Sequence, residues 1–209
     1  MQKITLYTNP NSRGKNIRWM LEECGADYDV VPVSYGTDGT KSADFLAINP
    51  MGKLPALKYG DTVITETLAI ITFLAELFSD KQLIPAEGTI ERAEFYRWLL
   101  FAVHVEYAIM DKYFGIPETP ERKRGIGYGS FDEALTTLSN FLKDKEYAVG
   151  DHFTALDLYL SGLIGWAIMR AQVLSMDSEL ATFMKRHAAR PAFAKAQQLD
   201  AELAKQMGL

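Results

Sequence analysis

The stretch Ile48–Leu57 has the sequence Ile-Asn-Pro-Met-Gly-Lys-Leu-Pro-Ala-Leu, and Thr65–Ile70 follows it with Thr-Glu-Thr-Leu-Ala-Ile. Pro55 stands just before a short apolar run and removes one backbone donor at a tight bend. It therefore predicts a cis peptide bond. A cis bond there would turn the N–H and C=O of Leu54 outward, where an extended peptide can pair with them.

A hairpin follows this bend. The run Ala56–Ile64 turns at Tyr59-Gly60-Asp61 and predicts two short antiparallel strands. Glu66 and Thr67 then open a helix, whose first N–H groups have no intrahelical partner and attract a carboxylate. An exposed strand edge beside a helix N-terminus predicts a site that holds a short peptide by its backbone and its acid group.

The residues before this stretch predict a β-α-β unit. Lys3–Tyr7 is a short strand, and apolar residues then recur at helical spacing until Gly25 ends the helix. Tyr28–Val33 is a second strand, expected to lie parallel to the first. With the hairpin and a helix over Thr67–Phe78, the order is β-α-β-α-β-β-α, which is the order of a thioredoxin-like domain.

The rest of the chain is predicted to be all helix. A long helix runs from Glu91 to about Tyr113, followed by a loop rich in Gly and Pro. Ser130-x-x-Glu133 is a capping-box pattern, and Thr154 with Asp157 forms a second one before a helix that is apolar on nearly every side. The predicted domains are 1–79 (thioredoxin-like), 80–88 (linker) and 89–209 (helical).

Charge and composition argue against nucleic acid, membrane and metal as partners. The 22 Lys and Arg against 27 Asp and Glu give a net charge of −5, with no long block of one sign, so we expect no nucleic-acid partner. No apolar run is long enough for a bilayer and no leader opens the chain, so we expect a cytoplasmic protein without a membrane partner. Cys24 is the single cysteine and the three histidines are widely spaced, which predicts no metal site.

The two motifs N-P-x-G-K-L-P-A-L and E-T-x-A-I together resemble the glutathione site of the cytosolic glutathione S-transferase family, in its bacterial, serine-type form. The resemblance covers nearly the whole chain. It implies a cytoplasmic detoxification enzyme with glutathione as co-substrate and no metal. It also implies a homodimer, and an apolar electrophile bound by the helical domain. It assigns glutathione binding to Lys53, Leu54, Pro55, Glu66 and Thr67.

The thiol donor is expected in the loop 9–14, because a donor at a helix N-terminus favours the thiolate. In one common register of the serine-type members, the activating serine stands two residues after the loop proline, which here is Ser12. Other serine-type registers point to Thr8 or Asn9, and the Asn11 amide can also donate. Tyr7 stands too far from Arg13-Gly14 for the tyrosine-type pattern, and Ser12 could instead cap the helix.

The second substrate is expected to contact Asn11, His104, Tyr107 and Trp166. Cys24 falls on the apolar stripe of the first helix, so we expect its side chain to serve in packing. Two classes of function follow from the resemblance. One is an enzyme that adds glutathione to an electrophile. The other is a related binding or regulatory protein without useful turnover. A specialised lyase, dehalogenase, isomerase or peroxidase is a variant of the first class.

Overall fold

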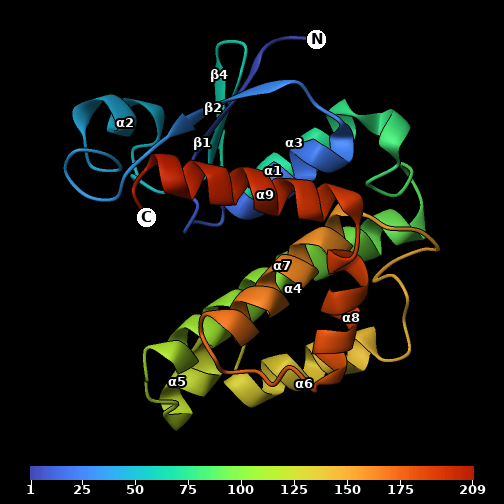
Figure 1. Ribbon diagram of the computed structural model, residues 1–209. Helices are drawn as coiled ribbons and strands as arrows, with labels where there is room; N and C mark the ends of the chain where they lie inside the picture. The colour runs from blue at the N-terminus through green and yellow to red at the C-terminus, as the bar shows by residue number, and fades with distance from the viewer. The chain divides into compact units, whose positions relative to one another are not determined.

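The computed structural model describes residues 1–209, which divide into two compact units (Figure 1). The first unit consists of residues 1–83 together with 190–209, and the second of residues 84–189. The first unit therefore includes the C-terminal segment of the chain. The sequence analysis placed residues 190–209 in the helical domain instead, because a helix that closes a helical run carries no local signal of the domain it packs on.

The first unit is built on a four-stranded sheet with the strand order β2-β1-β3-β4. Strands β1 and β2 are parallel, whereas β1–β3 and β3–β4 are antiparallel pairs. The strands are β1 (Ile4–Thr8), β2 (Tyr28–Pro32), β3 (Ala56–Tyr59) and β4 (Thr62–Thr65). The predicted β-α-β-α-β-β-α order is confirmed.

The helices of this unit cover the sheet. Helices α1 (Gly14–Cys24) and α3 (Thr67–Leu77) pack on each other and on the strands, and α9 (Pro191–Gln206) packs along α1. In β1 the buried Ile4 and Leu6 alternate with Tyr7, whose ring faces Phe45 of the short helix α2 (Ala43–Ile48) on the other side of the sheet. A 3₁₀ turn, Ser79–Lys81, follows α3.

The second unit is all helical. Its centre is α7 (Ala155–Met169), which packs on α4 (Ile90–Tyr113) and on α8 (Glu179–Ala188), while α6 (Phe131–Leu142) packs on α4 (Figure 1). The capping box of α7 is confirmed: the buried Asp157 carboxylate accepts the N–H of Thr154 at 2.7 Å and that of Ala148 at 2.6 Å. No helix combines the length and hydrophobicity needed to span a bilayer.

The loop predicted to contain Gly115, Pro117 and Pro120 ends at a short helix, α5 (Pro120–Gly125). Thr119 caps it by accepting the N–H of Arg122 at 3.2 Å, and Pro120 occupies its first turn. A proline after a threonine is a helix-start signal, since proline has no N–H to leave unpaired in the first turn.

Candidate functional site

Strand register brings three separate loops of the first unit to one end of the sheet. Ala56, at the start of β3, pairs with Tyr7 near the end of β1 and with Thr65 at the end of β4. The loop after β1, the bend before β3 and the segment after β4 are therefore neighbours. Ser12 lies in the first, Leu54-Pro55 in the second and Glu66-Thr67 in the third.

Two helices begin at this same end. Helix α1 starts at Gly14 after the β1 loop, and α3 starts at Thr67 directly after β4. Both N-termini carry partial positive charge, which favours a bound anion. The first N–H groups of α1 are already accepted by Ser12 and Arg13. No side chain caps α3, which leaves its first N–H groups to a ligand. The exposed Glu66 has φ 66° and ψ 120°, a conformation that non-glycine residues rarely adopt outside functional sites.

The Leu54-Pro55 peptide bond is cis, as predicted. Leu54 is half-buried and lies outside the strand ladder, which begins at Ala56. The bend is held by Asn49, a buried residue that the sequence analysis did not assign a role. Its side chain donates to the carbonyl of Lys53 at 2.8 Å and accepts the N–H of Met51 at 3.1 Å. The signal for it was the Asn-Pro pair that starts the loop.

The half-buried Ser12 hydroxyl is the centre of the turn between β1 and α1. It donates to the carbonyl of Asn9 at 2.8 Å and accepts the N–H of Gly14 at 3.0 Å, and the N–H of Asn9 lies 3.4 Å from it. A hydroxyl has one hydrogen to donate. Donation to a thiolate therefore requires the Ser12 hydroxyl to rotate away from Asn9.

The other candidate donors differ in burial and in the hydrogen bonds that their side chains already make. Thr8 and Asn9 are buried, and the Asn9 side chain donates to Val33 O at 3.0 Å and accepts the N–H of Asn11 at 2.9 Å. Tyr7 faces Phe45, with ring centroids 6.3 Å apart. Asn11 is exposed and no hydrogen bond engages its side-chain amide, whereas the hydrogen of the half-buried Ser12 hydroxyl is already donated to Asn9 O.

Cys24 lies away from this end of the sheet, at the last residue of α1, and only 1% of it is exposed. Burial raises the pKa of its thiol to about 12. A neutral, buried thiol is neither a nucleophile nor a metal ligand. No cluster of His, Cys, Asp and Glu that could hold a metal ion occurs in the structure.

The residues predicted for the second substrate come from both units. Asn11 belongs to the first unit, and His104, Tyr107 and Trp166 belong to the second. Trp166 of α7 contacts Tyr113, with centroids 6.3 Å apart, whereas His104 stands roughly two and a half turns away from Tyr113 along α4. Gly127 lies against the His104 ring, since a Cβ there would stand 2.5 Å from its Cε1.

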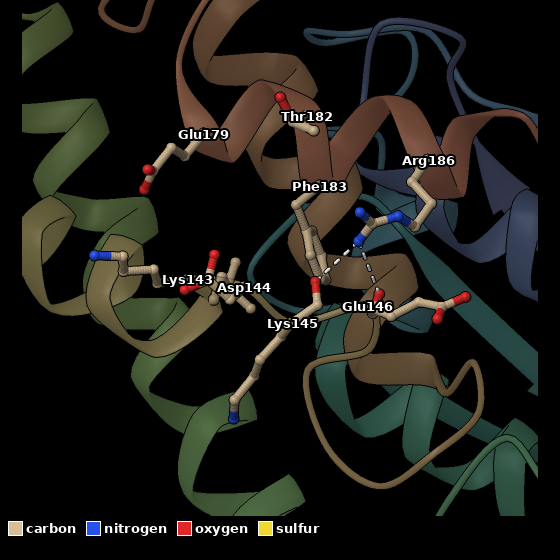
Figure 2. Close-up of a pocket in the computed structure, with 9 residues that line it drawn as sticks. Lys143, Asp144, Lys145, Glu146, Glu179, Thr182, Phe183 and Arg186 are labelled. Carbon is tan, nitrogen blue, oxygen red and sulfur yellow. Dashed lines mark hydrogen bonds between the residues drawn. The ribbon is translucent and has the colours of Figure 1, made fainter.

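A separate cavity of about 540 Å³ lies in the second unit between the end of α6 and α8 (Figure 2). Arg186 donates to the carbonyl of Lys145 at 2.9 Å, and the Lys145 ammonium in turn donates to Ala148 O and lies over the Phe141 ring. The cations and anions in its wall are balanced. No predicted site residue lines it: Leu142, Lys143, Asp144, Lys145, Glu146, Glu179, Thr182, Phe183 and Arg186.

Comparisons with known proteins identify the family. The family model described as glutathione S-transferase, N-terminal domain, matches residues 2–76. Glutathione S-transferase GstA of Escherichia coli O157:H7 is 31% identical over 90% of this chain and 94% of its own.

Solved structures are similar over nearly the full length. A glutathione transferase of Methylococcus capsulatus strain Bath has a TM-score of 0.78 at 30% identity, covering 95% of this chain and 98% of its own. A sphingomonad glutathione S-transferase complexed with glutathione has a TM-score of 0.77 at 27% identity, covering 94% of this chain and 98% of its own. Fold and sequence agree, and the chain belongs to the glutathione S-transferase family.

Proposed function

We propose that this chain binds glutathione at the end of the sheet where β1, β3 and β4 meet, lowers the pKa of its thiol, and adds the thiolate to an apolar electrophile. The observation that carries the proposal is the juxtaposition of the uncapped N-terminus of α3 and the start of α1 with the Leu54-Pro55 bend. Glutathione is an extended peptide with carboxylates at its ends, so a strand edge and helix N-termini match its chemistry.

The γ-glutamyl end is assigned to Glu66 and Thr67, where α3 begins. Leu54 offers its peptide groups to the backbone of glutathione, beside the cis Pro55. The exposed Lys53 is assigned to the glycyl carboxylate, which its positive charge would attract. The sphingomonad relative that was solved with glutathione supports this assignment by its similarity in fold.

Lowering the thiol pKa is the chemical contribution of the protein. A free thiol has a pKa near ~8.5, so only about 3% is thiolate at pH 7. A shift of two units corresponds to roughly 2.7 kcal/mol and ionises most of the bound thiol. A less basic thiolate is a weaker nucleophile, so the net gain in rate is about threefold, and positioning of the electrophile must contribute the rest.

Ser12 is the proposed donor to the sulfur, in concert with the N-terminus of α1. The electrophile is assigned to the second unit, where Trp166 with the exposed Tyr113 and Phe114 forms an aromatic cluster, and His104 lies further along α4. Asn11 is assigned to the side of the thiol on which the electrophile binds. The first unit is therefore proposed to bind glutathione and the second unit to bind the electrophile, as expected from the sequence.

A second candidate function is a glutathione-binding protein without useful turnover. The observation in its favour is the Ser12 hydroxyl, whose hydrogen is already donated to Asn9 O at 2.8 Å. A turnover assay with glutathione and a panel of electrophiles and peroxides, paired with calorimetric titration of glutathione, separates the two. Binding with turnover supports the enzyme, binding alone supports the second candidate, and no binding at millimolar concentration contradicts both.

The protein is also proposed to be a homodimer. Helix α4 buries Phe95, Trp98 and Leu99 but exposes Leu100 at 64% and Tyr107 at 62%. These two exposed side chains lie within about 20° of each other around the helix, so they form one apolar face. Tyr107 is therefore assigned to this face rather than to the second substrate. A second copy, related by a two-fold axis, would cover it.

A further inference from the structure

The charges on helix α1 oppose its dipole. Lys15 and Arg18 lie near its N-terminus, and Glu22 and Glu23 lie in its last turn, with no acidic residue in the first turn and no basic residue in the last. A helix prefers the opposite distribution. The charges of α1 therefore need compensation from a partner.

Helix α9 supplies that compensation (Figure 1). Arg18 Nε donates to Asp200 Oδ1 at 2.7 Å, and Lys195 Nζ lies 2.6 Å from Glu22 Oε2. Arg190, at the start of α9, binds both oxygens of Glu23 at 2.7 and 2.8 Å. Residue numbers fall along α9 as they rise along α1, so the helices are antiparallel and their charges complementary.

The three ion pairs differ in burial. Both side chains of the Arg18–Asp200 pair are buried, at 4% and 5% exposure, whereas Lys195 of the Glu22 pair is 66% exposed. Arg18 Nη2 is buried without a hydrogen-bond partner, so the Nε–Oδ1 bond carries the orientation of the guanidinium. Buried ion pairs of this kind contribute little net stability, and their use is to fix one register of packing.

The start of α1 is in tight contact with the proposed thiol site. Gly14 donates its N–H to Ser12 Oγ, and a Cβ on Gly14 would stand 1.9 Å from Thr8 Oγ1. Arg18 follows Gly14 by four residues, about one helical turn. Because Gly14 is in tight contact with Thr8 and Ser12, a rotation or shift of α1 displaces the Ser12 turn.

We propose that Asp200 is a positioning residue for the thiol chemistry: by holding Arg18, it fixes the rotation and axial position of α1 and so the place of Ser12. The C-terminal helix α9 then acts on the glutathione site indirectly, through α1, and contributes no atom to the site itself. This inference rests on the proposed function.

The test uses three variants of the full chain. Arg18→Met/Asp200→Leu replaces the buried pair by apolar side chains and avoids an uncompensated charge. Asp200→Asn keeps an acceptor for Arg18 Nε. Lys195→Ala is the matched control, because it removes an ion pair between the same helices at the other end of α1. Readouts are kcat, KM for glutathione, the pH titration of the bound thiolate, and amide exchange at residues 14–16.

The double variant is expected to stay folded, to lose at least about tenfold in kcat through misplacement of Ser12, and to exchange the amides at 14–16 at least about tenfold faster. The pKa of bound glutathione should rise, with KM changed less than about twofold, because α3 is untouched. Lys195→Ala should resemble the parent. Asp200→Asn should lie between the parent and the double variant, because it keeps the acceptor for Arg18 Nε but leaves the buried Arg18 charge unpaired.

A double variant that matches the parent in kcat, thiolate titration and amide exchange would overturn the inference while leaving the proposed function intact. Equal losses in the double variant and in Lys195→Ala would also overturn it, since general loosening of α9 would then explain both. A parent that binds no glutathione would overturn the proposed function together with this inference.

Discussion

Ser12 is the residue on which the proposed chemistry depends, and its hydroxyl serves the fold as well. It donates to Asn9 O and accepts the N–H of Gly14, so it fixes the turn that precedes α1. The structural role alone predicts a loss of stability on substitution. The proposed catalytic role predicts, in addition, a change in the bound thiol, and the two effects are measured separately.

Ser12→Ala should raise the pKa of bound glutathione by about one to two units, since a hydrogen bond to a charged group contributes about 1.5–3 kcal/mol. The conjugation rate near pH 7 should fall, with little change in glutathione affinity. Stability should fall by about 1 kcal/mol through the lost turn bonds. A pH-rate profile with glutathione and one electrophile gives the pKa.

Two further variants, Asn11→Ala and Tyr7→Phe, test the other candidate donors to the thiol. A profile for Ser12→Ala that overlays the parent, beside a shifted profile for Asn11→Ala, would transfer the donor role to the exposed Asn11 amide. Tyr7→Phe should have a mild effect, because Tyr7 faces Phe45 across the sheet from the buried Ile4 and Leu6.

Cys24 should be unreactive in the native protein. Burial raises its pKa to about 12, so at pH 8 the native thiol is protonated and shielded. Because the native pKa exceeds the unfolded value of about 8.5, its contribution to stability is present below pH 8.5 and is lost as pH rises toward 12. A disulfide reagent at pH 8 should modify no cysteine in the native chain and one after unfolding in guanidinium. Rapid modification of the native chain would contradict the buried placement.

At the scale of elements, the site is a product of strand register. Tyr7, Ala56 and Thr65 stand in one row, which places the ends of β1 and β4 beside the start of β3. The cis bend before β3, the β3–β4 hairpin and the start of α3 could be predicted from sequence because each carries a local signal: a proline at a bend, a glycine at a turn, a polar pair at a helix start. Their meeting at one edge needed the pairing of β1 with β3, which no local pattern specifies.

Two features of the fold could not be predicted, for different reasons. The packing of α9 on α1 depends on long-range pairs such as Arg18–Asp200, and a charge in the sequence does not identify its partner. The hydrogen bond from Ser12 to Asn9 depends on a hydroxyl rotamer within a turn, which sequence leaves open. The first decides which unit holds the C-terminus, and the second decides how Ser12 must move to act.

Thr67→Ala tests the start of α3. If the Thr67 hydroxyl binds the γ-glutamyl carboxylate, its loss should weaken glutathione binding by about 1–3 kcal/mol, or roughly 5- to 150-fold in Kd, by calorimetry. Thr72→Ala is the matched control, because Thr72 lies in the same helix away from its N-terminus. Equal affinities for Thr67→Ala and the parent would remove the Thr67 side chain from the site.

At the scale of the whole molecule, the exposed face of α4 predicts the assembly. Leu100→Glu should convert a homodimer into a monomer, because it places a charge in the centre of that face. Ile90→Glu is the control, since Ile90 is 73% exposed but lies on another side of α4. Light scattering at micromolar concentration distinguishes the states. A parent mass near the 23.4 kDa of one chain would refute the dimer.

The central claim is that the chain binds glutathione and holds it as a thiolate. The most direct measurement is the ultraviolet absorbance of the thiolate in a mixture of the parent chain with saturating glutathione, followed as a function of pH. The account predicts half-ionisation about two units below the free thiol value of about 8.5. A bound thiol that titrates together with free glutathione, or no saturable thiolate signal at all, would contradict it.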